Sequence, residues 1–286
     1  MTIPPASIAA DLAPSGTLRA SINLGNPVLA HGTAAAPAGV TVDIAHELGR
    51  RLGVDVELVC FEAARNSFEA MARGRADICF LAIEPAREAE VAFTAPYVLI
   101  EGVYAVPRES PFTTPADVDR DGVRIGVKQG SAYDLFLTRT LEHASVERGE
   151  EGVDAFRAQG LEVVAGIRQP MTAFVEANPD VRLIEDRFMQ IQQALGTTKT
   201  RRPETVQYLR DLVEELKAGG FVVPSACWIC MNRSSMRRTS GLASTNAVIG
   251  CLIPAATSRP WARNASTPSS PRSTLACSRV RVRNRS

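Results

Sequence analysis

Long apolar segments are missing from this sequence. It has no run of 18 or more apolar residues, so we expect no helix to span a membrane. Residues 1–16, MTIPPASIAADLAPSG, lack both the basic start and the continuous apolar stretch of a secretory signal. As written, the sequence therefore predicts either a cytoplasmic protein or a protein whose leader is missing. No repeat of fixed period occurs, which excludes a solenoid, and no helix-turn-helix segment precedes residue 17.

Acidic residues and lysine are absent from residues 222–286, although this segment contains ten arginines. The other 221 residues hold 22 basic and 31 acidic residues, a formal net charge of −9, so the overall charge of +1 hides two unlike regions. A GC-rich gene translated out of frame gives a composition of this kind. We expect residues 222–286 to be an atypical Arg/Ser/Pro-rich tail, disordered or the product of a frameshift.

A Cys-x-x-Cys pair, CWIC at 227–230, lies in this tail without the context that would give it chemistry. It follows a Gly-Gly helix stop, and the remaining cysteines of the tail stand alone instead of forming a second pair. We therefore expect no metal site and no cofactor. The arginines of the tail are scattered and follow no helix or strand pattern, so we expect no nucleic-acid partner.

The body of the chain alternates strand and helix patterns. Helix patterns include 40–53, where Ile44, Leu48 and Leu52 fall on one face, and 203–217, which begins with proline and ends at Gly219-Gly220. Such alternation predicts an α/β fold with mainly parallel sheets. The strand patterns are short and rich in Val, Ile and Leu: 18–23, 54–60, 77–82, 98–106, 123–127, 162–165, 182–184 and 189–194.

Two turn-like segments, 103–117 and 185–188, suggest crossings between two lobes joined by a hinge. We predict that residues 15–107 and 189–221 form lobe one and that residues 108–188 form lobe two. Residues 1–14 would be an N-terminal extension.

Polar residues stand at the ends of three predicted strands, where ligands of open α/β sheets gather. Asn23 ends the first strand and could contact a polar ligand, or serve only the turn Leu24-Gly25-Asn26-Pro27. Arg87, behind Glu84 and Pro85, carries a planar fork suited to a carboxylate, or it pairs with an acid on a solvated face.

The third strand end runs into the turn Gly130-Ser131-Ala132. Gly130 permits a tight turn, and Ser131 is placed to cap the next helix, which is a sufficient structural explanation. The same geometry also exposes backbone N–H groups to an anion. The GK[ST] ending of a phosphate-binding P-loop is absent.

Three segments in this order resemble the family 3 extracellular solute-binding proteins, which supply ABC transporters with polar amino acids. They are GVTVDIAHELGRRLG, ADICFLAIEPAREAEVAFTAPY and GVRIGVKQGSAYDLFL, within a similarity over about residues 15–221. The resemblance implies a two-lobed periplasmic-binding-protein type 2 fold, a periplasmic location despite the missing signal, an ABC permease as partner and a monomer. By position it assigns the ligand carboxylate to Arg87 and to Gly130–Ala132, and a ligand contact to Asn23.

Two departures from the family pattern bear on the ligand. FLAIEPAR is about two residues shorter than the family's lead-in and lacks its threonines. Where the family has an aspartate for the ligand amino group, this chain has Gly166, Ile167 and Arg168. Arg168 is either a second cation in the cleft, favouring a more acidic or non-amino ligand, or a solvated loop residue, and Glu84 could supply a compensating negative charge.

The sequence therefore predicts a non-enzymatic protein that captures a small carboxylate-bearing solute, an amino acid or related organic acid. The alternative is an enzyme on the same fold that dehydrates a cyclic carboxylate such as arogenate or prephenate. Glu84 would then be the general acid, although an acid at a helix start has a simpler electrostatic explanation.

Overall fold

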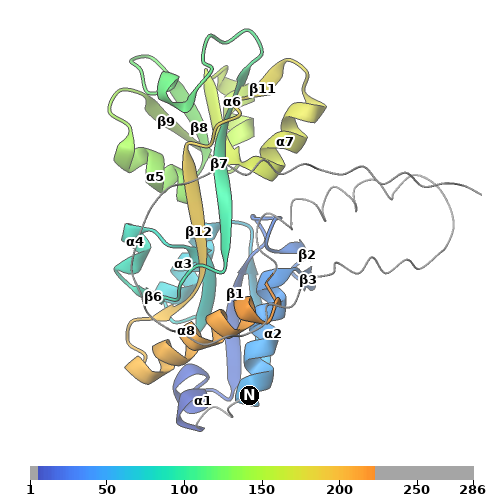
Figure 1. Cartoon of the computed structure of the whole chain (residues 1–286), viewed down its shortest axis with the longest axis vertical. Coiled ribbons are helices and arrows are strands. Elements are labelled where there is room, and N and C mark those ends of the chain that lie inside the picture. Colours follow the sequence, from blue (N-terminus) through green and yellow to red (C-terminus); the bar gives the residue numbers. More distant parts are fainter. Residues whose placement is uncertain (1–5, 223–286) are drawn as a thin grey trace, which may run out of the picture. The chain divides into compact units, whose positions relative to one another are not determined.

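The computed structural model describes residues 6–222, in which strands and helices build two lobes joined by two long strands (Figure 1). The tail expected at 222–286 lies, but for its first residue, outside the described residues, as does the Cys-x-x-Cys pair. Within 6–222, no helix combines the length and the apolar character needed to cross a membrane.

Lobe one is built on three neighbouring parallel strands. They are β4 (Asp55–Phe61), β1 (Thr17–Asn23) and β5 (Ile78–Ala82), in that order across the sheet. The connections and the later helix supply α2 (Val40–Leu52), α3 (Ala64–Ala72), α4 (Pro85–Glu88), β6 (Val91–Phe93) and α8 (Pro203–Ala218). A small hairpin of β2 (His31–Thr33) and β3 (Ala36–Ala38) lies between β1 and α2.

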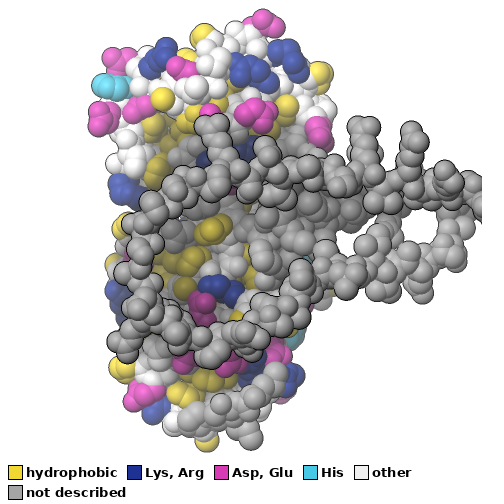
Figure 2. Space-filling model, viewed as in Figure 1, with side chains coloured by type: hydrophobic (Ala, Val, Ile, Leu, Met, Phe, Trp, Pro, Cys, Tyr) yellow, Lys and Arg dark blue, Asp and Glu magenta, His cyan; other side chains and the backbone are white. Residues whose placement is uncertain are grey.

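Lobe two repeats the plan with β9 (Ser145–Gly149), β8 (Arg124–Lys128) and β10 (Val163–Ile167) as parallel neighbours. The helices are α5 (Ala132–Thr140), α6 (Gly152–Gln159) and α7 (Arg168–Ala177), with a 3-10 turn at Pro115–Asp117 and β11 (Val181–Leu183). On the face that Figure 2 shows, acidic and basic side chains are interspersed over this lobe. Each lobe is therefore an α/β layer with parallel strands at its centre, as the sequence predicts.

The local sequence pattern explains where helix α2 packs and where it ends. In α2 the three residues spaced four apart, Ile44, Leu48 and Leu52, are all buried. The helix ends where Gly53 adopts a left-handed conformation, φ 70°, and its N–H donates to the Gly49 carbonyl. Glycine reaches this conformation without strain, which is why the sequence pattern locates the helix end well.

The lobes are joined by β7 (Val98–Pro107) and β12 (Met189–Thr198), which run antiparallel to each other. Val98–Gly102 of β7 pair with β12, whereas residues from Gly102 onward pair with β10 and β11 of lobe two. We expected the first crossing at the turn after residue 107. The structure places it inside the strand, because one continuous β7 pairs with partners in both lobes.

Residues 6–12, expected within an extension outside the lobes, form helix α1 (Ala6–Leu12) on lobe one. Ile8 and Leu12 are buried in the main core. Asp11 accepts hydrogen bonds from the Thr205 hydroxyl at 2.6 Å and from the Arg202 backbone at 3.1 Å. This short helix is therefore anchored to the start of α8 by both apolar and polar contacts.

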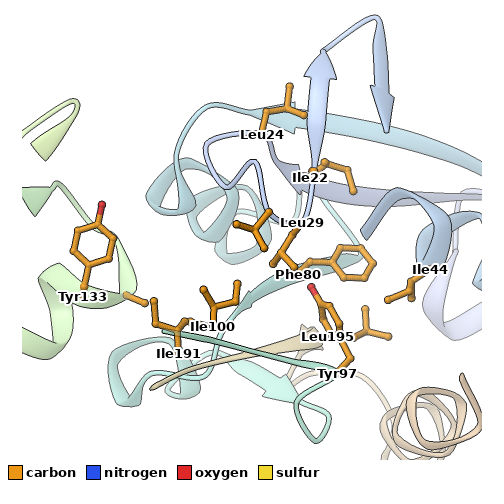
Figure 3. Close-up of a cluster of buried hydrophobic side chains, with 14 of the residues drawn as sticks. Ile22, Leu24, Leu29, Ile44, Phe80, Tyr97, Ile100, Tyr133, Ile191 and Leu195 are labelled. Carbon is orange, nitrogen blue, oxygen red and sulfur yellow. The ribbon is translucent and has the colours of Figure 1, made fainter. Parts of the chain in front are cut away.

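The largest apolar cluster extends from lobe one along the connecting strands into lobe two (Figure 3). Phe80 and Tyr97 meet edge to face in lobe one, with ring centroids 6.2 Å apart. Ile100 and Ile191 continue the cluster on β7 and β12, and Tyr133 belongs to α5 of lobe two. Since this apolar cluster continues from one lobe to the other, the polar groups between the lobes lie next to close-packed side chains.

Candidate functional site

A cavity of about 50 Å³ opens between the lobes. Lobe one and the connecting strands contribute the ends of β1 and β5, α3, α4 and β12, and lobe two contributes the turn between β8 and α5 together with the end of β10. The cavity is lined by Asn23, Gly25, Asn26, Ala64, Leu81, Ala82, Arg87, Lys128, Gln129, Ser131, Ala132, Tyr133, Ile167, Ile191 and Gln193.

Arg87 is the buried cation of the site, with only 2% of its surface exposed. One terminal nitrogen of its guanidinium donates to the Ala82 carbonyl at 3.2 Å, and the other donates across the gap to the Gly130 carbonyl at 3.0 Å. Burial lowers the pKa of Arg87 to about 10, against the opposing influence of the Glu84 and Cys79 side chains. The side chain is therefore cationic at neutral pH, and it touches both lobes.

The turn at Gly130–Ala132 brings lobe two to this arginine. Gly130 has φ 69°, and a Cβ at this position would lie 2.7 Å from the Cβ of Arg65, so a larger residue fits neither the backbone nor the space. The Ser131 side chain accepts a hydrogen bond from the Asp134 backbone at 3.1 Å and caps α5. Ser131 and Ala132 line the cavity, and Gly130 offers its carbonyl to Arg87.

Asn23 lines the cavity at the end of β1, where its side-chain oxygen accepts from the Gly25 backbone at 3.1 Å. The turn explanation and the ligand explanation of this residue are thus compatible. Its side-chain oxygen serves the turn while the residue faces the cavity.

Three predicted site residues lie outside the cavity lining: Gly130, which reaches Arg87 only through its carbonyl, Glu84 and Arg168. The Glu84 side chain, 5% exposed, accepts from Arg139 of lobe two at 2.9 Å. Arg168 begins α7, and its Nε donates to Glu101 on β7 at 2.5 Å while a terminal nitrogen donates to the Glu185 carbonyl at 2.7 Å. Arg168 thus pairs with a carboxylate on β7, one of the two strands that join the lobes. It does not place a second positive charge in the cavity.

A third arginine holds the lobes together beside the cavity. Arg65, in α3, donates to the Gln129 carbonyl at 3.0 Å and to the Glu150 carboxylate at 2.6 Å. With Arg87 on Gly130 and Arg139 on Glu84, three arginines bridge the two lobes around one site. The relative position of the two lobes therefore depends on hydrogen bonds made next to the cavity.

Sequence reasoning missed several cavity residues. Lys128 ends β8, two residues before the turn Gly130–Ala132 begins, and Asn26 lies in the turn after Asn23. Gln193 is a buried residue of β12, whereas Gln190 and Gln192 are exposed on the same strand. Successive side chains of a strand point to opposite faces, so Gln193 is expected to face inward if Gln190 faces outward. This alternation is the sequence signal that could have identified Gln193.

Residues 6–222 contain no group of three or more His, Cys, Asp or Glu side chains placed to hold a metal ion. The chemistry present in the cavity is hydrogen bonding, one buried guanidinium and the Lys128 ammonium, which pairs with Glu151. Such a site suits capture of a small anion.

The sequence and structure were compared with known proteins. The model of the bacterial extracellular solute-binding proteins, family 3, matches residues 23–222. A search of the curated proteins returned no match.

Similar solved structures include a mutant of ArgBP from T. maritima, with 22% identity and a TM-score of 0.63, covering 79% of this chain and 99% of that one. A protein from Wolinella succinogenes complexed with lysine has 17% identity and a TM-score of 0.60, covering 72% and 91%. The ancestral amino acid-binding protein AncCDT-1, a precursor of cyclohexadienyl dehydratase, has 20% identity and a TM-score of 0.59, covering 74% and 94%. At these identities the likeness shows the fold.

Proposed function

Because this chain belongs to the bacterial extracellular solute-binding proteins of family 3, we propose that it captures a small carboxylate-bearing solute between its lobes. The solute would be an amino acid or a related organic acid, delivered to the permease of an ABC transporter from the periplasm by a monomeric protein. The family match confirms the family that the sequence motifs predicted.

The observation that supports this function best is the Arg87 guanidinium, buried at the floor of the cavity. It donates to two carbonyl oxygens, Ala82 and Gly130, and to no carboxylate among the described residues. A buried guanidinium without a carboxylate partner is stabilised when an anion binds it, and its planar fork matches a carboxylate. Since one of its present partners belongs to lobe two, binding at Arg87 also affects how the lobes meet.

Calorimetry with a panel of amino acids and organic acids tests this proposal. Arg87→Ala should weaken the best binder by about 2–5 kcal/mol, because the loss of a desolvated charged pair has that magnitude. Arg73→Ala is the matched control, since Arg73 lies on the exposed end of α3 and pairs with Glu69 there. Unchanged affinity in Arg87→Ala would show that the solute binds elsewhere.

A dehydratase is the second candidate, motivated by the precursor relationship stated for AncCDT-1. Its expected general acid, Glu84, is less suited to this role here, because its carboxylate faces Arg139 instead of the cavity. Incubation of the protein with prephenate and arogenate, followed by product analysis, distinguishes the two functions. Product formation above a heat-treated control would establish catalysis, and its absence together with carboxylate binding supports a binding protein.

A further inference from the structure

The charges around the cavity are nearly all paired within the protein. Three ion pairs flank the cavity: Arg65 with Glu150, Arg139 with Glu84, and Lys128 with Glu151. Among the described lining residues only Arg87 and Lys128 are charged, and none is acidic. Arg87 is left with carbonyl partners, so the site has one positive charge that no carboxylate of residues 6–222 hydrogen-bonds.

Asn26 lines the same cavity and carries an unsatisfied hydrogen-bond acceptor. The residue is 4% exposed, and its side-chain oxygen is buried with no hydrogen-bond partner in the described part of the chain. Its backbone is fixed, because the Asn26 carbonyl accepts from the backbone N–H groups of Leu29 and Ala30 at 3.0 and 3.1 Å. A buried acceptor without a partner is costly, so a ligand that donates a hydrogen bond at this place gains affinity.

These two features make different demands on a ligand. One unmatched guanidinium calls for one carboxylate, and one orphan amide oxygen calls for one N–H or O–H donor. An α-ammonium group could donate to Asn26, but its positive charge would be buried beside Arg87 with no acidic residue in the described lining. Burying a charge without a partner is far more unfavourable than burying a hydrogen-bonded hydroxyl.

The geometry points to a small hydroxy monocarboxylate as the ligand, with its carboxylate on Arg87 and its hydroxyl donating to the side-chain oxygen of Asn26. This inference rests on the proposed function of carboxylate capture at the same site. A cavity of about 50 Å³ suits acids of two or three carbons, since a space of this measure holds on the order of four water-sized groups. The site therefore discriminates against the amino acid that has the same carbon skeleton.

Matched pairs of ligands test this selectivity on the full chain. Calorimetry is performed with glycolate and glycine, L-lactate and L-alanine, and L-glycerate and L-serine, with propionate as the carboxylate that lacks a donor. The hydroxy acid should bind at least tenfold more tightly than its amino acid in each pair, and L-lactate more tightly than propionate. Equal or tighter binding of the amino acids overturns the inference and leaves carboxylate capture intact. If no carboxylate in the wider panel binds either, the proposed function fails as well.

Substitution of Asn26 tests which residue makes the distinction. Asn26→Asp places a carboxylate where the orphan oxygen lies, so the preference for the hydroxy acid over the amino acid should fall at least tenfold. Gln190→Glu is the matched control for added negative charge, because Gln190 is exposed on β12 and does not line the cavity. An unchanged preference in folded Asn26→Asp removes Asn26 from the explanation, and the wild-type pairs decide the ligand class even if the variant does not fold.

Discussion

Arg87 and Arg168 occupy corresponding places in the two lobes, yet their surroundings differ. Each follows a central strand at its carboxyl end, β5 for Arg87 and β10 for Arg168. Arg87 is buried and donates to main-chain carbonyls, whereas Arg168 donates to the Glu101 carboxylate. The difference comes from the neighbouring strand, because Ile167 of β10 pairs with Gly102, the residue after Glu101. In lobe two the adjacent strand supplies an acid that takes up the arginine, whereas Arg87 has no carboxylate hydrogen-bond partner within residues 6–222.

The largest expected effect comes from replacing each of these two arginines with lysine, which keeps the positive charge, and comparing the affinity for a carboxylate. Arg87→Lys retains one positive charge but loses the planar fork, so we expect the affinity for the best carboxylate to fall by about 2 kcal/mol, roughly 30-fold. Arg168→Lys should change the affinity by less than about 0.5 kcal/mol, because surface ion pairs of this kind contribute little. Calorimetry of both variants against the same ligand provides the comparison. An equal loss in both would mean that the two sites are not distinct.

A smaller effect is expected at the ion pair that joins the lobes beside Arg87. The Glu84 carboxylate is buried and accepts from Arg139, whose side chain is 46% exposed. Since the arginine is partly solvated, the coupling between the two should be about 1 kcal/mol. A double-mutant cycle of Glu84→Gln and Arg139→Gln, followed by urea denaturation, measures it. Strictly additive losses would show that the pair contributes nothing to the folded state.

Local patterns were sufficient to predict the elements that carry the site. The strands β1, β5 and β8 and the turn at Gly130–Ala132 follow from apolar periodicity, from a glycine that permits the turn and from a capping serine. Because the carboxyl ends of parallel strands meet at one edge, Asn23 and Arg87 could be expected to lie near each other. The placement of both in one cavity lining is therefore a consequence of strand order that a reader of the sequence could anticipate.

Contacts between distant segments were beyond this kind of reasoning. The partner of Arg168 is Glu101, 67 positions earlier in the chain, and only strand pairing brings the two together. Asn26 looked like a turn residue, and nothing in its neighbourhood indicates that its side-chain oxygen lacks a partner. The first lobe junction was also displaced, because the pairing of β7 with strands of both lobes is a property of the folded sheet.

The smallest expected effect concerns Glu101, the acid that pairs with Arg168 and so makes its surroundings differ from those of Arg87. Burial acts to raise the pKa of Glu101, but hydrogen bonds from Arg168 and Arg187 outweigh it and hold the pKa below its usual value of 4.5. A lowered pKa in the folded state means that the carboxylate stabilises the protein above about pH 4.5 and that this contribution is lost as the pH falls toward the lowered pKa.

Glu101→Gln should therefore reduce the free energy of unfolding by about 0.5 kcal/mol at pH 7, a modest value because the side chain is 34% exposed. The difference from wild type should shrink in urea titrations below pH 4, while Glu109→Gln, an exposed control, should show no such trend. A difference that stays constant from pH 7 to pH 3 would mean that the glutamate acts through packing, and the contrast between the two arginines would then need another explanation.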